Sequence, residues 1–287
     1  SGGGGKGMRI VWKDEDLEEN LKIASREAEA NFADGTVFIE KYLQNPRHVE
    51  LQVIADGKGG VAIMGERDCS VQKNHQKLIE ESPSPGVTPE MRKKMSDGAR
   101  NLFGSLKYRG AGTIEFLVAG NEFFFMEVNA RIQVEHPVSE FVTGTDLIRE
   151  QILVCLGEPM TIDPDKVELR GWSIEARINA LAPGKVKHLE IPGGPGVRFD
   201  SFLYTGATVS PHYDSMVGKL IVHDSDRSVL FLFLRAMGEL KIEGVPVNIE
   251  TQKKILSHET FRSGDFGTGL YARLEKELHL DLKEAKS

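Results

Sequence analysis

The first part of the chain has apolar positions at the spacing of strands and of one helix. Runs rich in β-branched and aromatic residues predict four short strands. These runs are residues 8–12, 37–42, 49–55 and 61–65. Apolar residues recur at three- and four-residue steps from Leu17 to Ala28, which predicts a helix between the first two strands. Asp14 or Asp16 would cap that helix, and residues 33–35 would end it, giving a small α+β unit.

Two alternating runs in the middle of the chain predict a hairpin, after a helix expected over residues 89–107. In the register we favour, apolar residues face one another on one side. The apolar pairs would be Ile114 with Val128, Phe116 with Met126 and Val118 with Phe124. The other side then pairs Glu115 with Glu127. A two-residue Gly-Asn turn would instead set Glu127 opposite Ile114 and mix polar with apolar residues on both sides.

Facing carboxylates on this hairpin point to a cation. Glu115 and Glu127 would repel each other unless a proton or cation lies between them, and Asn129 adds an oxygen ligand on the same face. Hard oxygen ligands suit a Mg²⁺ ion that bridges nucleotide phosphates. The alternative is an edge strand with two exposed glutamates.

The segment that follows the hairpin has the chemistry of an anion site. In extended form Arg131, Gln133 and Glu135 would lie on one side, continuous with the face of the carboxylates. Arg offers a fork to bicarbonate or phosphate, Gln a neutral donor and Glu a base. A surface salt bridge is the alternative.

Composition excludes two classes of partner. The 287 residues include 36 Lys+Arg against 43 Asp+Glu, a net charge of −7, so we expect no nucleic acid. The longest apolar run, residues 229–234, is far shorter than the roughly 20 residues of a membrane span, so we expect no membrane role. Cys69 and Cys155 are too few to staple so large a chain and fit a reducing compartment.

A series of motifs, in order along nearly the whole chain, resembles biotin carboxylase. The motifs are residues 2–8, 40–43, 46–52, 66–77, 126–137, 177–179 and 213–216. The resemblance implies an α+β chain with an ATP-grasp fold followed by a biotin carboxylase C-terminal α+β domain. Residues 1–42 would be part of the ATP-grasp lid, residues 43–170 the catalytic core and residues 171–287 the C-terminal domain.

The resemblance also implies an ATP site with Mg²⁺ or Mn²⁺. The lid over the phosphates would consist of Gly3, Gly4, Gly5, Lys6, Gly7 and Met8. Adenine would be contacted by Glu40, Lys41 and Leu43, and the ribose and neighbouring groups by His48, Gln72 and His75. The metal would be held by Glu115, Glu127 and Asn129, of which the two glutamates also belong to the ATP site.

Catalytic roles follow from the same resemblance. Lys77, Arg131, Gln133 and the backbone of Val134 would position bicarbonate, and Glu135 would be its general base. Attack on ATP would give carboxyphosphate, which breaks down to CO₂ and phosphate, and the phosphate would take a proton from biotin. Arg177 would stabilise the biotin enolate; its strand, residues 172–180, places Ser173, Glu175, Arg177 and Asn179 on one face.

The implied function is ATP-dependent carboxylation of biotin on the biotin carboxyl carrier protein, the first half-reaction of acetyl-CoA carboxylase in fatty acid synthesis. The expected partners are that carrier, carboxyltransferase subunits and a second copy of the chain, in the bacterial cytoplasm or the plastid stroma. Alternatives are the same domain of pyruvate carboxylase or of an acyl-CoA carboxylase α chain, and a catalytically silent fragment that binds nucleotide or the carrier. The family's preceding α/β domain and its ATP-contacting lysine lie outside the sequence, so we expect a fragment that does not turn over.

Overall fold

The computed structural model describes residues 7–280 and divides the chain into two units. The first unit is residues 1–44 with residues 74–76, and the second is residues 45–73 with residues 77–287. The predicted domain boundaries at residues 42 and 170 stay predictions. No helix among the described residues is long and apolar enough to cross a membrane.

The first unit is built on one helix. A 3₁₀ turn, η1 (Asp14–Asp16), leads into α1 (Leu17–Phe32), whose buried side chains are Ala24 and Ala28. Ala33 ends the helix in a left-handed conformation, with its N–H donating to the carbonyl of Glu29. The predicted helix is therefore confirmed, but the side chain of Asp16 at the N-cap makes no capping hydrogen bond.

Two of the predicted strands are wrong. Residues 8–12 and 37–42 have no strand structure and pair with no neighbouring strand among the described residues. Composition rich in β-branched residues gives a strand only where another backbone completes the ladder, because strand propensity is mostly a preference for a packed, paired surface. The composition of these two runs favours strands, but the described residues of the first unit provide no paired strand beside them.

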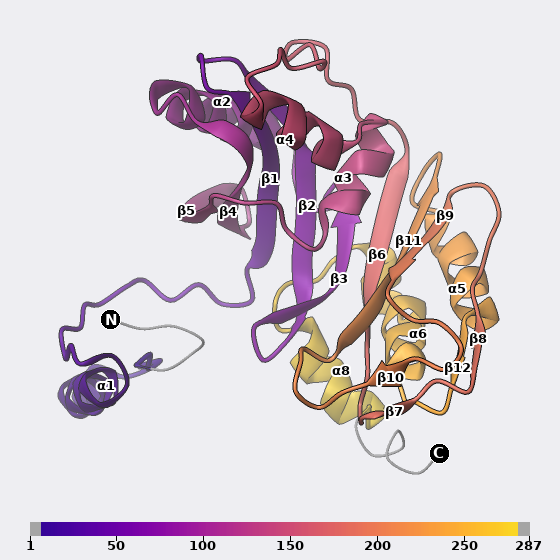
Figure 1. Ribbon diagram of the computed structural model, residues 1–287. Helices are drawn as coiled ribbons and strands as arrows, with labels where there is room; N and C mark the ends of the chain where they lie inside the picture. Colours follow the sequence, from indigo (N-terminus) through magenta and orange to yellow (C-terminus); the bar gives the residue numbers. More distant parts are fainter. Residues whose placement is uncertain (1–6, 281–287) are drawn as a thin grey trace. The chain divides into compact units, whose positions relative to one another are not determined.

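The second unit contains an eight-stranded sheet in the order β5-β4-β1-β2-β3-β6-β11-β9 (Figure 1). Its strands are β1 (Arg47–Asp56), β2 (Val61–Lys73), β3 (Gln76–Ser82), β4 (Arg109–Ala119), β5 (Glu122–Asn129), β6 (Trp172–Asn179), β9 (Val197–Ser201) and β11 (Met216–Asp224). The predicted strands over residues 49–55 and 61–65 are confirmed, and the second continues to Lys73. Pairing is antiparallel between β1 and β2, β1 and β4, β4 and β5, β3 and β6, β6 and β11, and β9 and β11.

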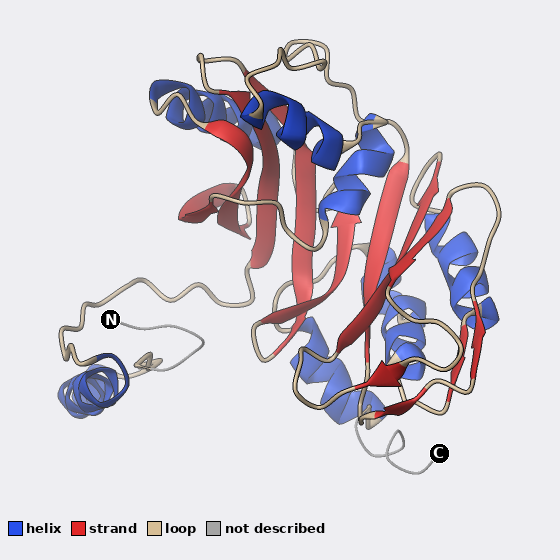
Figure 2. Ribbon diagram, viewed as in Figure 1, coloured by secondary structure: helices blue, strands red, loops and turns tan. Residues whose placement is uncertain are grey.

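Helices cover both faces of this sheet (Figure 2). The predicted helix over residues 89–107 is α2 (Pro89–Ser105), which packs on β1 and β2. Helix α3 (His136–Thr143) contacts β2, β6 and β11, and α4 (Leu147–Cys155) contacts β1 and β4. Because side chains alternate along a strand, Val49 and Leu51 join the core under α2, whereas His48, Glu50 and Gln52 occupy the other face. That other face carries the polar groups of the site.

The hairpin register is partly as predicted. Glu115 pairs with Glu127 and Ile114 with Val128, but the register shifts between Glu115 and Phe116. Phe116 therefore pairs with Phe125, and Val118 with Phe123. The predicted pairs of Phe116 with Met126 and Val118 with Phe124 are wrong.

The physical reason is the turn. Gly120 takes a φ of 59°, and the two-residue Gly-Asn turn that we rejected closes the hairpin. A bulge then shifts the pairing by one residue. Met126 is 43% exposed and Val128 is 38% exposed, so the predicted apolar face is buried on the β4 strand only.

The C-terminal part surrounds a second core. Two small sheets pair β7 (Gly184–Lys185) with β10 (Thr208–Val209) and β8 (His188–Glu190) with β12 (Lys241–Glu243). The helices are α5 (Val229–Glu239), α6 (Ile249–Ser257), α7 (Glu259–Ser263) and α8 (Leu270–Leu278).

The apolar run at residues 229–234 allows a matched test of this core. Phe233 is 0% exposed, whereas Phe231 on the same helix is 67% exposed and has the Arg262 guanidinium over its ring. Phe233→Ala should lower the free energy of unfolding by about 3–5 kcal/mol, because it leaves a cavity. Phe231→Ala should cost only about 0.5–1 kcal/mol through the lost cation–π contact. Denaturant unfolding followed by circular dichroism measures both, and equal losses would contradict the packing.

Candidate active site

Lys77 is the centre of a cluster of buried carboxylates. Its Nζ atom lies 2.6 Å from Glu50 Oε2, 2.6 Å from Glu135 Oε1 and 3.3 Å from Glu115 Oε1. These carboxylates come from β1, β4 and the turn before α3, so the sheet and the helix must be assembled for the cluster to exist. The predicted residues Lys77, Glu115 and Glu135 are brought together.

Arg67 forms the floor of the cluster and was missed by the sequence analysis. Its side chain is 0% exposed and donates to Glu50 Oε1 at 2.6 Å and to Gln52 Oε1 at 2.7 Å. It also donates to Ser139 Oγ at 3.0 Å on α3 and to Gln133 Oε1 at 3.3 Å. A guanidinium suits this position because its planar set of donors reaches several acceptors at once.

Glu115 collects hydrogen bonds from several predicted site residues. Asn129 Nδ2 and Gln133 Nε2 each donate to its Oε1 atom at 2.9 Å. His48 Nε2 lies 2.7 Å from its Oε2 atom, and Gln72 Nε2 lies 2.7 Å from His48 Nδ1. With Gln72 as donor to Nδ1, His48 carries its proton on Nε2 and donates it to Glu115. His48 therefore orients a carboxylate of the site.

Glu135 lies between two cations. Its Oε1 atom accepts from Lys77, and its Oε2 atom accepts from Arg177 Nη2 at 3.0 Å. Arg177 on β6 also donates from Nε to Glu80 Oε1 at 2.7 Å. Both oxygens of Glu135 are therefore fixed in direction by positive charge, and the side chain is only 1% exposed.

The electrostatics of the cluster favour ionised carboxylates next to Lys77. Burial alone would raise the pKa of Glu50, but the charges of Arg67 and Lys77 outweigh it and lower the pKa to about 2. Burial likewise opposes the ionised form of Glu115, yet the hydrogen bond from His48 and the charge of Lys77 lower its pKa to about 2. The surrounding anions raise the pKa of Lys77 despite its burial. The cluster thus holds its charges at neutral pH.

The segment after the hairpin differs from the expected extended form. Residues 131–135 form a bend and a turn that lead into α3. Gln133 and Glu135 point into the buried cluster, whereas Arg131 is exposed and makes long contacts of 3.3 Å to the Ile132 carbonyl and 3.5 Å to Asn129 Oδ1. The expectation that all three side chains share one strand face is therefore wrong, because α3 begins directly after Glu135.

Val134 contributes its backbone, but to a residue that the sequence analysis missed. Its carbonyl accepts a hydrogen bond from Lys219 Nζ on β11, which also lies 3.9 Å from Asp200. Lys219 on β11 and Glu50 on β1 are charged residues between apolar neighbours, whereas Arg67 and Glu80 lie in polar runs that offer no such contrast. The contrast around Lys219 and Glu50 is the signal that could have identified those two, because buried charges occur almost only when they are paired.

The predicted metal ligands Glu115, Glu127 and Asn129 are neighbours on the hairpin. Asn129 Nδ2 lies 2.9 Å from Glu115 Oε1 and 3.3 Å from Glu127 Oε1, so the two carboxylates and the amide converge. Glu115 is 5% exposed, whereas Glu127 on the edge strand is exposed. Carboxylate and amide oxygens suit Mg²⁺ or Mn²⁺. Asn129 presents its Nδ2 atom to both carboxylates, however, and its Oδ1 atom lies 3.5 Å from Arg131 Nη2, so the metal site stays a prediction.

Other predicted nucleotide contacts belong to the first unit or lie outside the described residues. Gly7, Met8, Glu40, Lys41, Leu43 and His75 are part of the first unit, and their assignment to ATP stays a prediction. Gly3, Gly4, Gly5 and Lys6 lie outside the described residues.

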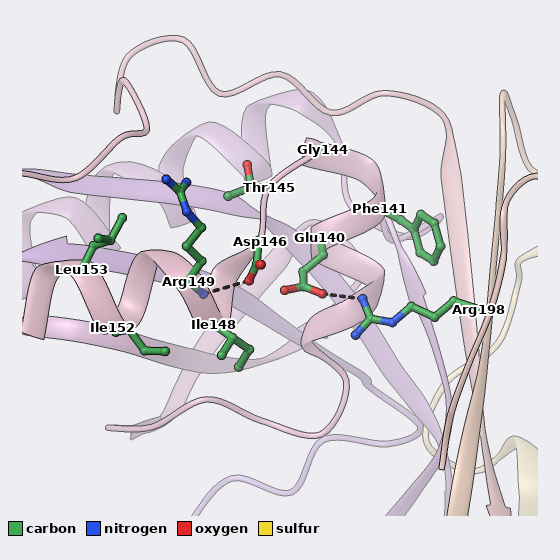
Figure 3. Close-up of a pocket in the computed structure, with 10 residues that line it drawn as sticks. All are labelled: Glu140, Phe141, Gly144, Thr145, Asp146, Ile148, Arg149, Ile152, Leu153 and Arg198. Carbon is green, nitrogen blue, oxygen red and sulfur yellow. Dashed lines mark hydrogen bonds and ion pairs between the residues drawn. The ribbon is translucent and has the colours of Figure 1, made fainter.

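A surface hollow of about 650 Å³ between α3, α4 and β9 contains none of the predicted site residues (Figure 3). An ion pair of 2.7 Å between Glu140 and Arg198 crosses it, and the side chain of Asp146 caps α4 by accepting from the Arg149 backbone N–H. These contacts connect α3 and α4 to their surroundings, so this hollow is distinct from the charged cluster.

Comparison with known proteins decides the family. Residues 1–163 match the model of the carbamoyl-phosphate synthase L chain, ATP binding domain, and residues 175–273 match the biotin carboxylase C-terminal domain. The chain belongs to the biotin carboxylase family. The ATP-grasp fold followed by a biotin carboxylase C-terminal domain is thereby confirmed.

Individual relatives agree with this assignment. The biotin carboxylase of Haemophilus influenzae is 46% identical over 288 residues, covering 98% of this chain and 64% of the relative. One of the pyruvate carboxylase subunits of Methanothermobacter thermautotrophicus is 43% identical, covering 99% of this chain and 60% of the relative. The chain thus spans less than two thirds of the length of these relatives.

A solved structure has the same fold. It is the biotin carboxylase domain dimer of 2-oxoglutarate carboxylase from Hydrogenobacter thermophilus, in complex with MgADP, ADP and bicarbonate. It superposes with a TM-score of 0.88 at 37% identity, over 97% of this chain and 63% of that chain.

Because carboxylates surround Lys77, replacing it should lower the free energy of unfolding by an amount that depends on pH. Lys77→Met should destabilise the second unit by about 3–5 kcal/mol at pH 7, because it leaves buried anions without their cation. The pKa values of Glu50 and Glu115 are lowered, so the stabilisation by Lys77 is present above the unfolded pKa of about 4.3 and fades as pH falls towards 2. The destabilisation should therefore shrink below pH 4.

Denaturant unfolding of the variant and the parent between pH 3 and pH 8 measures this effect. Lys93→Met is the control, because Lys93 and Asp97 form an exposed pair worth at most about 1 kcal/mol. A destabilisation by Lys77→Met that stays constant from pH 8 to pH 3 would contradict the charge argument.

Proposed function

We propose that the enzyme to which this chain belongs carboxylates biotin with ATP and bicarbonate. The observation that carries the proposal is the position of Glu135, which has Lys77 on one oxygen and Arg177 on the other. A base between two cations can take a proton from a small oxyanion that the same cations bind. The family assignment supports this interpretation.

The proposed reaction uses bicarbonate as nucleophile. Glu135 removes the proton of bicarbonate, whose oxygen attacks the γ-phosphorus of ATP, and the bond from that phosphorus to ADP breaks. The carboxyphosphate formed breaks down to CO₂ and phosphate, and the phosphate takes the N–H proton of biotin. The biotin nitrogen then bonds to the carbon of CO₂. Arg177 stabilises the biotin enolate, because a permanently charged guanidinium lowers the energy of an oxyanion.

Bicarbonate would be held by Lys77, Gln133, Arg131 and the backbone of Val134. Arg131 is the exposed member of this set, so its fork can close on a ligand that arrives from solvent. Gln133 already donates to Glu115 at 2.9 Å, which connects the anion site to the metal site. The two sites share one hydrogen-bond network.

ATP and a divalent cation complete the proposal. Glu115, Glu127 and Asn129 would hold Mg²⁺ or Mn²⁺, which neutralises charge as the phosphoryl group moves. The relative from Hydrogenobacter thermophilus contains MgADP and bicarbonate, which supports the same ligands here. His48 and Gln72 would contact the nucleotide.

We assign the parent to acetyl-CoA carboxylase, with the biotin carboxyl carrier protein and carboxyltransferase subunits as partners and a homodimer as the assembly. Bacterial and chloroplastic relatives support a location in the cytoplasm or the plastid stroma. Pyruvate carboxylase is the second candidate, because one subunit of such an enzyme is 43% identical to this chain. Carboxylation of acetyl-CoA but not pyruvate by the reconstituted holoenzyme would separate the two.

Removing the base tests the chemistry. In the full-length enzyme, Glu135→Gln should lower the rate of biotin carboxylation about 10²–10⁴-fold, the usual loss for a general base. The affinity for ATP should change little, because Glu135 is assigned to bicarbonate. Steady-state kinetics and nucleotide titration measure the two effects. A parental rate in the variant would show that Glu135 is not the base.

The 287-residue chain itself should bind nucleotide weakly and turn over at background rate. Phosphoryl transfer depends on positioning and charge stabilisation around the γ-phosphate. The relatives are longer than this chain, and we expect residues outside their matched part to supply some of that positioning and charge stabilisation. ADP release with saturating ATP, Mg²⁺, bicarbonate and biotin measures this. Robust bicarbonate-dependent release would mean that this chain contains a sufficient active site.

A further inference from the structure

Two buried carboxyl groups face each other beside Arg177. Glu80 on β3 and Glu175 on β6 are directly opposite in the antiparallel register, and both are 0% exposed. Side chains paired in this way have Cβ atoms about 4.5–5.5 Å apart. The register therefore places two acids next to each other in the interior of the sheet.

These two acids differ in their partners. Glu80 Oε1 accepts from Arg177 Nε at 2.7 Å, whereas Glu80 Oε2 has no hydrogen-bond partner among the described residues. Both carboxyl oxygens of Glu175 also lack a hydrogen-bond partner within that part of the chain. A buried carboxylate without donors is one of the costliest groups in a protein, and a neutral carboxylic acid is far less costly.

The charged groups on the elements around Glu175 have other partners. Lys219 on β11 donates instead to the Val134 carbonyl, and Arg177 on β6 is shared between Glu80 and Glu135. Arg67 on β2 is occupied by Glu50, Gln52 and Ser139. On α3, His136 lies against the Gln133 carbonyl and Glu140 pairs with Arg198. No ion pair to Glu175 exists among the described residues.

The balance of charge around the site agrees with one neutral acid in the cluster. Buried acidic groups here are Glu50, Glu80, Glu115, Glu135 and Glu175, and the cations among them are Arg67, Lys77, Arg177 and Lys219. The acids exceed the cations by one, so one proton brings the cluster to neutrality.

We propose that the pair formed by Glu80 and Glu175 carries one proton, that this proton is on Glu175, and that Glu175 is therefore a positioning residue. As a neutral acid it allows Glu80 to stay ionised across the strand pair. Ionised Glu80 in turn holds Arg177 by its Nε atom and directs the other end of the guanidinium to Glu135. The directions of the pKa shifts support the same order: burial raises the pKa of Glu175 well above its usual range, whereas the charge of Arg177 opposes the effect of burial on Glu80.

A spectroscopic test needs no turnover. Infrared difference spectra of the 287-residue chain should show the carbonyl stretch of a protonated carboxylic acid at pH 7. Glu175→Gln should remove that band, and Glu190→Gln should keep it, because Glu190 is an exposed residue paired with Lys241. The same band in both variants would overturn the proposal.

Unfolding provides a second readout on the same chain. When folding raises the pKa of a carboxyl group, the unfolded state binds fewer protons than the folded state at pH values between the two pKa values. The free energy of unfolding therefore falls as pH rises from the pKa of the unfolded state towards the pKa of the folded state. Above pH 5 the unfolding equilibrium constant of the parent should rise relative to Glu175→Gln by up to about tenfold per pH unit. Identical pH dependence would overturn the proposal. If Glu175→Gln does not fold, Glu80→Gln should retain the infrared band, and its loss there would overturn the proposal.

The kinetic arm rests on the proposed function. In the full-length enzyme Glu175→Gln should keep carboxylation within about twofold at pH 7–8, because a neutral amide replaces a neutral acid. Glu80→Gln should lose about tenfold or more, because Arg177 loses its counter-ion. A large loss in Glu175→Gln with the infrared and unfolding results intact would reject the positioning role alone. Absence of carboxylation in the parent would instead reject the proposed function and leave the spectroscopic result standing.

Discussion

Ionised side chains buried beneath α3 are the constraint on which the rest of this structure depends. Lys77 connects carboxylates of β1, β4 and the turn before α3, and Arg177 connects Glu80 on β3 with Glu135 in that turn. Arg67 connects Glu50 on β1 with Ser139 on α3. A buried pair is costly to form and far more costly to break, so these contacts add little net stability but allow few alternative arrangements. The sheet must hold its strands in one register, or charges lose their partners.

That constraint also explains how the site is prepared for chemistry. Glu135 is fixed by cations on both oxygens before any ligand arrives, and Glu115 is fixed by His48, Gln133 and Asn129. Groups already oriented need little rearrangement when charge develops during the reaction. Arg131 is the exception, because its exposed guanidinium has only long contacts and can adjust to an incoming anion.

Sequence patterns predicted the parts of this molecule that local chemistry determines. The helix from Leu17, the strands over residues 49–55 and 61–65, and the pairing of Glu115 with Glu127 are all present. Sequence patterns gave wrong predictions where contacts with residues distant in the sequence determine the local structure. Residues 8–12 and 37–42 have the composition of strands but pair with no strand among residues 7–280, and the turn before α3 bends a segment that reads as extended. The roles of Glu50 and Arg67 depend on contacts between strands that no spacing in the sequence reveals.

The bulge in the β4–β5 hairpin shows how two local requirements are satisfied together. Next to the turn, the two-residue Gly-Asn connection pairs Ala119 with Glu122. Farther along the strands, the pairing of Glu115 with Glu127 requires a register shifted by one residue. A strand slipped by one residue presents every side chain to the opposite face, so a regular ladder from this turn would direct Glu127 away from Glu115. One extra residue on β5 restores the alignment. The facing of the two glutamates therefore depends on an irregularity in the hairpin, and the regular alternation that first suggested it is insufficient to build it.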